Sequence, residues 1–216
     1  MHIFFIEKTI KCINYFFNIA FQLKAIVILK IITRYIFTLK RWKVEGELPP
    51  KPHRFILLCG PHTSNWDVLY GLGASSIKHL DNKMLVNKKM FKPLLGSILK
   101  KLGAIPVNKE ENEGVVSKAI EMFKNNKEFV LTINPEGGKT KCTKFRTGFY
   151  HIAKQANVPI VMCYFDYKRK VVGIRNLFYL TDNMQNDFIK IWEYYKNIEG
   201  KFPKNGISGK LEFTMA

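Results

Sequence analysis

Acidic residues are scarce in this sequence. Only 17 Asp and Glu stand against 35 Lys and Arg in 216 residues, which gives a formal net charge of +18. A surface of this charge attracts polyanions such as nucleic acids, anionic lipid headgroups and phosphorylated small molecules. The sequence has no helix-turn-helix, RNP-type or zinc-finger signature. We therefore expect no specific nucleic-acid partner, and anionic lipid remains the favoured one.

Cysteine is also sparse, and its pattern excludes several kinds of site. The four cysteines form no C-x-x-C pair, and no Cys/His cluster has the spacing of a zinc site. A chain of this length can bury a core without disulfides or metals. The sequence also lacks the G-x-S-x-G elbow of a serine hydrolase. We expect reduced, buried thiols and no bound metal.

A long uninterrupted apolar run is missing, although residues 3–39 are the most apolar part of the chain. They contain neither Gly nor Pro, which predicts helix, but five Lys and Arg residues interrupt them. The stretch 25–39 would rise about 22 Å as a helix, short of the ~30 Å hydrocarbon core of a bilayer.

Residues 1–45 are therefore predicted to form an N-terminal helical segment that associates with membranes. Amphipathic helices would lie on anionic lipid at the cytoplasmic face, in a peripheral or monotopic arrangement. The alternative is that these helices pack on the protein's own core, with lysine side chains reaching outward. Whether they span the bilayer or lie on it is left open.

Residues 46–216 are predicted to form one α/β domain, joined to this segment by the basic, Pro-rich link 41–52. Short apolar runs predict strands at 54–60, 83–87, 104–107, 128–134, 158–167 and 170–174. Helical periodicity predicts helices at 65–80, 91–102, 115–123, 147–155 and 187–198. This alternation indicates a mixed, largely parallel central sheet flanked by helices. In such sheets the functional groups gather at the carboxyl ends of the strands.

The first strand end carries His62, with Asp67 five residues later at the start of a predicted helix. Asp67 can accept a hydrogen bond from one imidazole nitrogen, so that the other can take a proton from a hydroxyl. A pair with this spacing also arises by chance, as a histidine in a turn and an acidic residue near a helix start. The pair alone does not decide between these interpretations.

Two further strand ends carry lysine or glycine. Lys109 follows the strand at 104–107, and Pro135, Glu136, Gly137, Gly138 and Lys139 follow the strand at 128–134. Glycines allow backbone N–H groups to approach an oxyanion or phosphate closely, and the lysines add charge. The second loop is not a nucleoside-triphosphate P-loop, because Ile133 stands where that motif needs its first glycine.

In sequence order the chain carries PHTSNWD, NK, NPEGGKT, KFRTG and VPIV, between residues 61 and 161. This set resembles the glycerolipid acyltransferase family typified by 1-acylglycerol-3-phosphate acyltransferases, in a small bacterial branch. The resemblance covers about half of the chain, and each motif falls at the expected strand end. It implies an O-acyltransferase of the H-x-x-x-x-D type that acts in phospholipid biosynthesis.

The resemblance also implies roles. His62 would be the general base and Asp67 its partner, in direct transfer from an acyl thioester to a lipid hydroxyl. The donor would be acyl-CoA or acyl-carrier protein, used as a co-substrate and without a further cofactor. Lys109 would contact the acceptor phosphate, and Pro135, Glu136 and Gly137, with Gly138 and Lys139, would form the acceptor site.

Departures from the family pattern concern the acceptor site. Lys109 and Lys139 stand where the family usually has Arg, and Lys lacks the planar fork that grips phosphate in two places. Lysophosphatidate, another lysophospholipid and an amino-lipid therefore all stay open as acceptors. Two other functions stay open as well: a non-catalytic protein that binds anionic lipid or nucleic acid, and a thioesterase that uses the same His–Asp pair.

Overall fold

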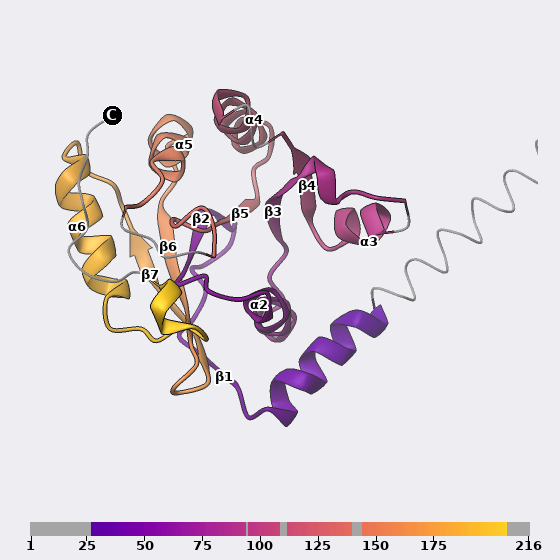
Figure 1. Ribbon diagram of the computed structural model, residues 1–216. Helices are drawn as coiled ribbons and strands as arrows, with labels where there is room; N and C mark the ends of the chain where they lie inside the picture. Colours follow the sequence, from indigo (N-terminus) through magenta and orange to yellow (C-terminus); the bar gives the residue numbers. More distant parts are fainter. Residues whose placement is uncertain (1–26, 94, 109–111, 140–143, 207–216) are drawn as a thin grey trace, which may run out of the picture.

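The computed structural model describes residues 27–93, 95–108, 112–139 and 144–206 (Figure 1). They form one seven-stranded sheet in the order β1-β7-β6-β2-β5-β3-β4. The strands are β1 (Lys43–Glu45), β2 (Arg54–Gly60), β3 (Asn82–Asn87), β4 (Ala104–Val107), β5 (Phe129–Ile133), β6 (Ile160–Asp166) and β7 (Val171–Phe178). The strands from β6 to β4 in this order are all parallel, whereas β7 is antiparallel to β6 and carries β1 parallel to itself. The predicted mixed, largely parallel sheet is confirmed.

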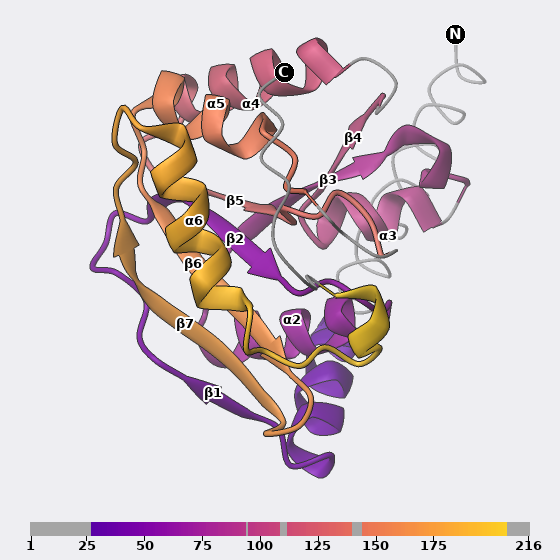
Figure 2. The ribbon, with the colours of Figure 1, turned by 60° about the vertical axis from the view of Figure 1, so that its left-hand side comes forward.

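Helices cover both faces of the sheet (Figures 1 and 2). They are α2 (Trp66–Ile77), α3 (Leu95–Lys101), α4 (Asn112–Asn125), α5 (Gly148–Ala156) and α6 (Met184–Tyr195), with short 3₁₀ turns at Lys88–Met90 and Pro203–Asn205. One core cluster joins the sheet to α4, α5 and α6, and the other joins it to α2 and to the helix at residues 27–39. The protein is thus a three-layer sandwich.

The centre of the sheet explains why the strands were visible in the sequence. In β2, which reads RFILLCG, every residue after Arg54 is buried. Strands covered on both faces are continuously apolar rather than alternating, because both sets of side chains enter a core. β2 lies between β5 and β6, so its carboxyl end is flanked by the carboxyl ends of two parallel neighbours.

The N-terminal helix at residues 27–39 has one buried side and one exposed apolar side. Phe37 is buried and packs against Trp42 and Tyr70 of the core. The large apolar side chains that stay exposed are Val27, Ile28, Ile31, Ile32, Tyr35 and Leu39. Among the described residues, no helix is long and apolar enough to cross a membrane. Residues 1–26, the larger part of the predicted membrane-associating segment, lie outside the described residues.

The link predicted at residues 41–52 contains structure that the sequence pattern did not reveal. Its residues Lys43–Glu45 form β1, which pairs with β7, and its Trp42 is buried and stacks on Tyr70 with 3.9 Å between ring centroids. A three-residue strand is too short to show alternation, so composition alone suggested a linker. The domain boundary after residue 45 coincides with the end of β1 and stays a prediction.

Candidate active site

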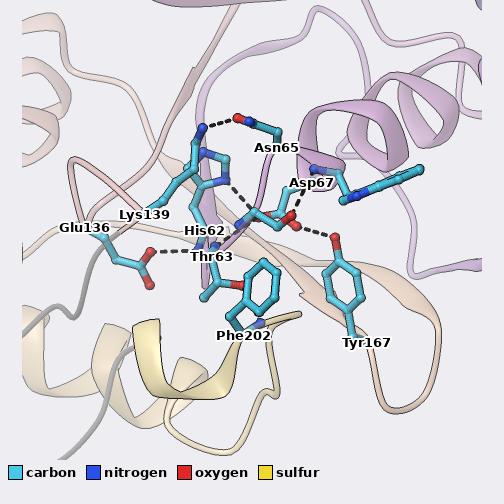
Figure 3. A network of polar contacts seen from close by, with 10 residues as sticks. His62, Thr63, Asn65, Asp67, Glu136, Lys139, Tyr167 and Phe202 are labelled. Atoms are coloured by element: carbon cyan, nitrogen blue, oxygen red, sulfur yellow. Dashed lines mark hydrogen bonds and ion pairs between the residues drawn. The ribbon is translucent and has the colours of Figure 1, made fainter.

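The site forms where the loops after β5, β2 and β6 meet at one edge of the sheet. These three strands are parallel neighbours, so their carboxyl ends lie side by side. The loop after β2 carries His62, the loop after β5 carries Glu136 and Lys139, and the turn after β6 carries Tyr167 (Figure 3). Strand order therefore gathers residues that are far apart in the sequence.

His62 and Asp67 form the predicted pair. His62 Nδ1 lies 3.0 Å from Asp67 Oδ2, and both residues are buried. Asp67 sits in the first turn of α2, where the positive end of the helix dipole stabilises a negative charge. No described residue forms a hydrogen bond with His62 Nε2, so this nitrogen is left for a substrate.

Backbone and side-chain donors hold the Asp67 carboxylate in place. Oδ2 accepts hydrogen bonds from the backbone N–H groups of Thr63 at 3.0 Å and Ser64 at 2.9 Å. Oδ1 accepts from the hydroxyl of Tyr167 at 2.5 Å. Donors that converge on a carboxylate stabilise its charge and fix its orientation. These donors therefore fix the orientation of the Asp67 carboxylate beside His62.

Glu136 supports the same loop from the opposite side. Its Oε2 accepts a hydrogen bond from the backbone N–H of His62 at 2.7 Å, while its buried Oε1 bonds to no described residue. Burial raises the pKa of Glu136 to about 7; the bond from His62 opposes this rise and the negative charge of Asp67 adds to it. Near neutral pH this carboxyl can therefore change its charge beside His62.

The glycine-rich loop places its lysine beside the start of α2, at the end of the loop that carries His62. Gly137 has a positive φ of 70°, and a Cβ there would lie 2.7 Å from the side chain of Arg146. The backbone N–H of Arg146 in turn donates to the carbonyl oxygen of Pro135 at 2.7 Å. Lys139 Nζ donates to Asn65 Oδ1, at the start of α2. Figure 3 shows the Lys139 side chain directed at Asn65.

The structure describes only part of the remaining predicted site residues. Gly138 is exposed in the loop after β5, and Lys109 lies outside the described residues. β4, which precedes Lys109, is separated from β2 by β5 and β3. The Ser64 hydroxyl accepts from Trp66 N–H at 3.2 Å, which is a turn role and not that of a nucleophile. Among the described residues, no group of three or more His, Cys, Asp or Glu could hold a metal ion.

Comparison with known proteins places this site in a family. Residues 41–166 match the model of the family described as Acyltransferase, which is more than half of the chain. The chain belongs to the acyltransferase family.

A solved structure supports the same fold for this acyltransferase. This chain is similar to the crystal structure of the 1-acyl-sn-glycerophosphate (LPA) acyltransferase PlsC from Thermotoga maritima, with a TM-score of 0.55 and 17% sequence identity. The similarity covers 78% of this chain and 76% of that one. Comparison with curated proteins gives no match.

Two parts of the acyltransferase site were missed from sequence, and both lie beyond the matched region. Tyr167 follows β6 directly, so the same strand-end reasoning that picked out His62 and Glu136 would have found it. The C-terminal segment gave no such signal in the sequence. In the structure, Phe202 N–H donates to Thr63 Oγ1 at 3.2 Å, and a Cβ at Gly200 would lie 2.7 Å from the same oxygen. This segment therefore packs directly on the loop that carries His62.

Proposed function

We propose that this acyltransferase moves a fatty acyl group from an acyl thioester to the hydroxyl of a lysophospholipid-type acceptor. The first acceptor to test is 1-acylglycerol-3-phosphate, the substrate named for PlsC. The observation that carries the proposal is the His62 Nδ1–Asp67 Oδ2 contact of 3.0 Å, which leaves Nε2 to act on a substrate. Acyl-CoA and acyl-carrier protein are the two candidate donors.

In this reaction His62 Nε2 takes the proton from the acceptor hydroxyl, whose oxygen attacks the thioester carbonyl carbon. The carbonyl oxygen becomes a tetrahedral oxyanion. When that intermediate collapses, the C–S bond breaks and the leaving thiolate receives the proton from His62. Asp67 fixes the tautomer and stabilises the transient imidazolium. No covalent intermediate on the protein is needed.

The loop after β5 is suited to the charges that this reaction creates. Backbone N–H groups at Gly138 and Lys139 are candidates for oxyanion donors, since a glycine-rich turn lets a ligand approach closely. Lys139 is exposed and its Nζ reaches Asn65, at the entrance to α2, so it can also contact an acceptor phosphate. Lys109 stays a proposed phosphate contact on the resemblance alone.

The exposed apolar side of the helix at residues 27–39 supports action at a membrane surface. Ile28, Ile31 and Tyr35 are each more than half exposed, although a helix on the surface of a globular protein normally turns such residues inward. Lys30 and Arg34 are interspersed and would contact anionic headgroups. We place the enzyme at the cytoplasmic face, on lipid that also holds its acceptor.

The decisive experiment is acyl transfer from labelled long-chain acyl-CoA and acyl-carrier protein to a panel of lysolipids in anionic vesicles. We expect His62→Ala to lose about 1,000-fold or more in turnover with an unchanged unfolding transition, because no other described group replaces the base. His151→Ala, on the exposed side of α5, is the matched control and should keep full activity.

Each remaining outcome points to a different function. Folded His62→Ala with near-normal transfer would contradict the mechanism. Release of free fatty acid without any acceptor would indicate the thioesterase. Tight vesicle binding without transfer would indicate a non-catalytic lipid-binding protein, whereas wild-type protein that stays in solution when the vesicles are sedimented would contradict the membrane placement.

A further inference from the structure

Tyr167 occupies a position that neither the sequence motifs nor the family match includes. It follows the last residue of β6 and begins the turn to β7, one residue beyond the matched region 41–166. Its hydroxyl nevertheless donates to Asp67 Oδ1 at 2.5 Å, across 100 residues of sequence. Asp67 Oδ1 is the carboxylate oxygen that does not contact His62. Among the described residues, Tyr167 is the one side chain that donates to it.

Two aromatic rings hold the Tyr167 ring, and a backbone hydrogen bond holds its main chain. Trp42 contacts it edge-on at 4.9 Å and Tyr70 at 5.8 Å between ring centroids. Its backbone N–H donates to the carbonyl oxygen of Glu199 at 2.9 Å, so the C-terminal segment fixes the turn. A tyrosine that packs on two rings and is anchored through its backbone loses little conformational freedom when its hydroxyl forms a hydrogen bond. The Tyr167 hydroxyl is therefore pre-organised to donate to Asp67.

We propose that Tyr167 is a positioning residue of the acyl-transfer reaction, which orients the Asp67 carboxylate and moderates its pull on the imidazole of His62. The inference rests on the proposed role of His62 as general base. A hydroxyl that donates to Oδ1 draws negative charge away from Oδ2, the oxygen that contacts His62 Nδ1. Without the hydroxyl, the carboxylate is shared only with the backbone N–H groups of Thr63 and Ser64, and more of its charge acts on the imidazolium.

Other titratable groups near the pair lie on β2, on α2, in the loop after β5 and in the C-terminal segment, which contributes Glu199 and Lys201. Cys59 lies at the end of β2, Tyr70 on α2, and Glu136 and Lys139 in the loop after β5. Glu136 bonds the backbone of His62 and not its ring. None of these groups is a hydrogen-bond partner of the Asp67 carboxylate, whose side-chain donors among the described residues are His62 and Tyr167.

The test is Tyr167→Phe, with Tyr164→Phe as its matched control. Tyr164 also donates its hydroxyl to a carboxylate, Glu45 Oε2 at 3.2 Å, but away from the site. In vesicles with lysolipid acceptor and acyl thioester, Tyr167→Phe should lower kcat about tenfold, the equivalent of one hydrogen bond to a charged group, with KM nearly unchanged. Tyr164→Phe should keep the wild-type kcat.

A second readout follows the His62 ring itself by NMR titration and does not depend on turnover. In Tyr167→Phe the midpoint of the His62 titration should move to higher pH by about half a unit or more, because the Asp67 carboxylate, without the Tyr167 donor, favours the imidazolium more strongly. The acid limb of the kcat/KM profile should move to higher pH by the same amount. In an Asp67→Asn background the same substitution should move the midpoint by less than about 0.2 unit, since the coupling passes through that carboxylate.

The outcomes separate this inference from the proposed function. Equal shifts in both backgrounds, or a Tyr167→Phe enzyme with wild-type kcat and an unmoved midpoint, would overturn the role of Tyr167. A wild-type protein without acyl transfer would overturn the proposed function, and the NMR midpoints would still decide whether Tyr167 acts on His62 through Asp67.

Discussion

Asp67 and Glu136 are two buried carboxylates on opposite sides of the same loop, and their surroundings differ sharply. Asp67 accepts from two backbone N–H groups, the Tyr167 hydroxyl and the His62 ring. Glu136 accepts from a single backbone N–H, and its other oxygen has no partner among the described residues. Burial accompanied by donors stabilises a charge, whereas burial with one donor raises the pKa, here to about 7.

The comparison teaches that the loop carrying His62 can lie between a carboxylate that partners the imidazole and a carboxyl that titrates near neutrality. Asp67 is the group suited to stabilise the imidazolium throughout the reaction. Glu136 is suited to fix the backbone of His62, since a carboxyl oxygen can accept the N–H bond whether the group is charged or neutral. The predictions below test this division, in order of expected effect.

The largest effect is expected for Asp67→Asn. The amide keeps the size of the side chain but carries no charge to stabilise the imidazolium and can favour the wrong imidazole tautomer, so kcat should fall by about 1,000-fold or more. Steady-state acyl transfer measures the loss, and circular dichroism checks the fold. If the variant retained more than about a tenth of wild-type turnover, Asp67 would not be the partner of the base.

Glu136→Gln should change how stability depends on pH. The folded-state pKa of about 7 lies above the ordinary value of 4.5, so the folded protein binds the proton more tightly than the unfolded chain. Wild-type stability should therefore fall as pH rises from about 5 to 8, by up to about 3 kcal/mol from this group. The amide of the Glu136→Gln variant cannot ionise, so the substitution should remove that part of the slope.

Urea unfolding of both proteins at pH 5 and pH 8 measures the difference. We expect the Glu136→Gln variant to gain stability relative to wild type as pH rises. A relative loss at pH 8 would mean that Glu136 is stabilised as a carboxylate, and the contrast with Asp67 would disappear.

The smallest effect is expected for Gly137→Ala, which strains the loop that carries Glu136. Alanine is disfavoured at the φ of 70°, and its Cβ would meet the flexible side chain of Arg146, so we expect a loss of about 1–2 kcal/mol in the free energy of unfolding. Gly138→Ala is the neighbouring control, since its φ is not in the positive range. Equal losses in both variants would show that the φ of Gly137 is not what shapes the loop.

Much of the fold was predictable because the strands of the sheet centre are continuous apolar runs. The strand predicted at 104–107 agrees with β4 and the one at 54–60 with β2. The predicted helix at 91–102 is shorter in the structure, as α3 begins only at Leu95, after Pro93. β1 was missed because its three residues pair with β7, which is distant in sequence, and carry no periodic signal of their own.

The sequence by itself determined that His62 and Asp67 stand five residues apart at the junction of a strand and a helix, and that Glu136 and Lys139 follow another strand. Local geometry of this kind depends on neighbouring residues only. The tertiary structure alone decided that Glu136 accepts a hydrogen bond from the backbone N–H of His62 and that the Tyr167 hydroxyl donates to the Asp67 carboxylate. Those contacts join residues 74 and 100 positions apart, and they exist because β2 lies between β5 and β6 in the sheet.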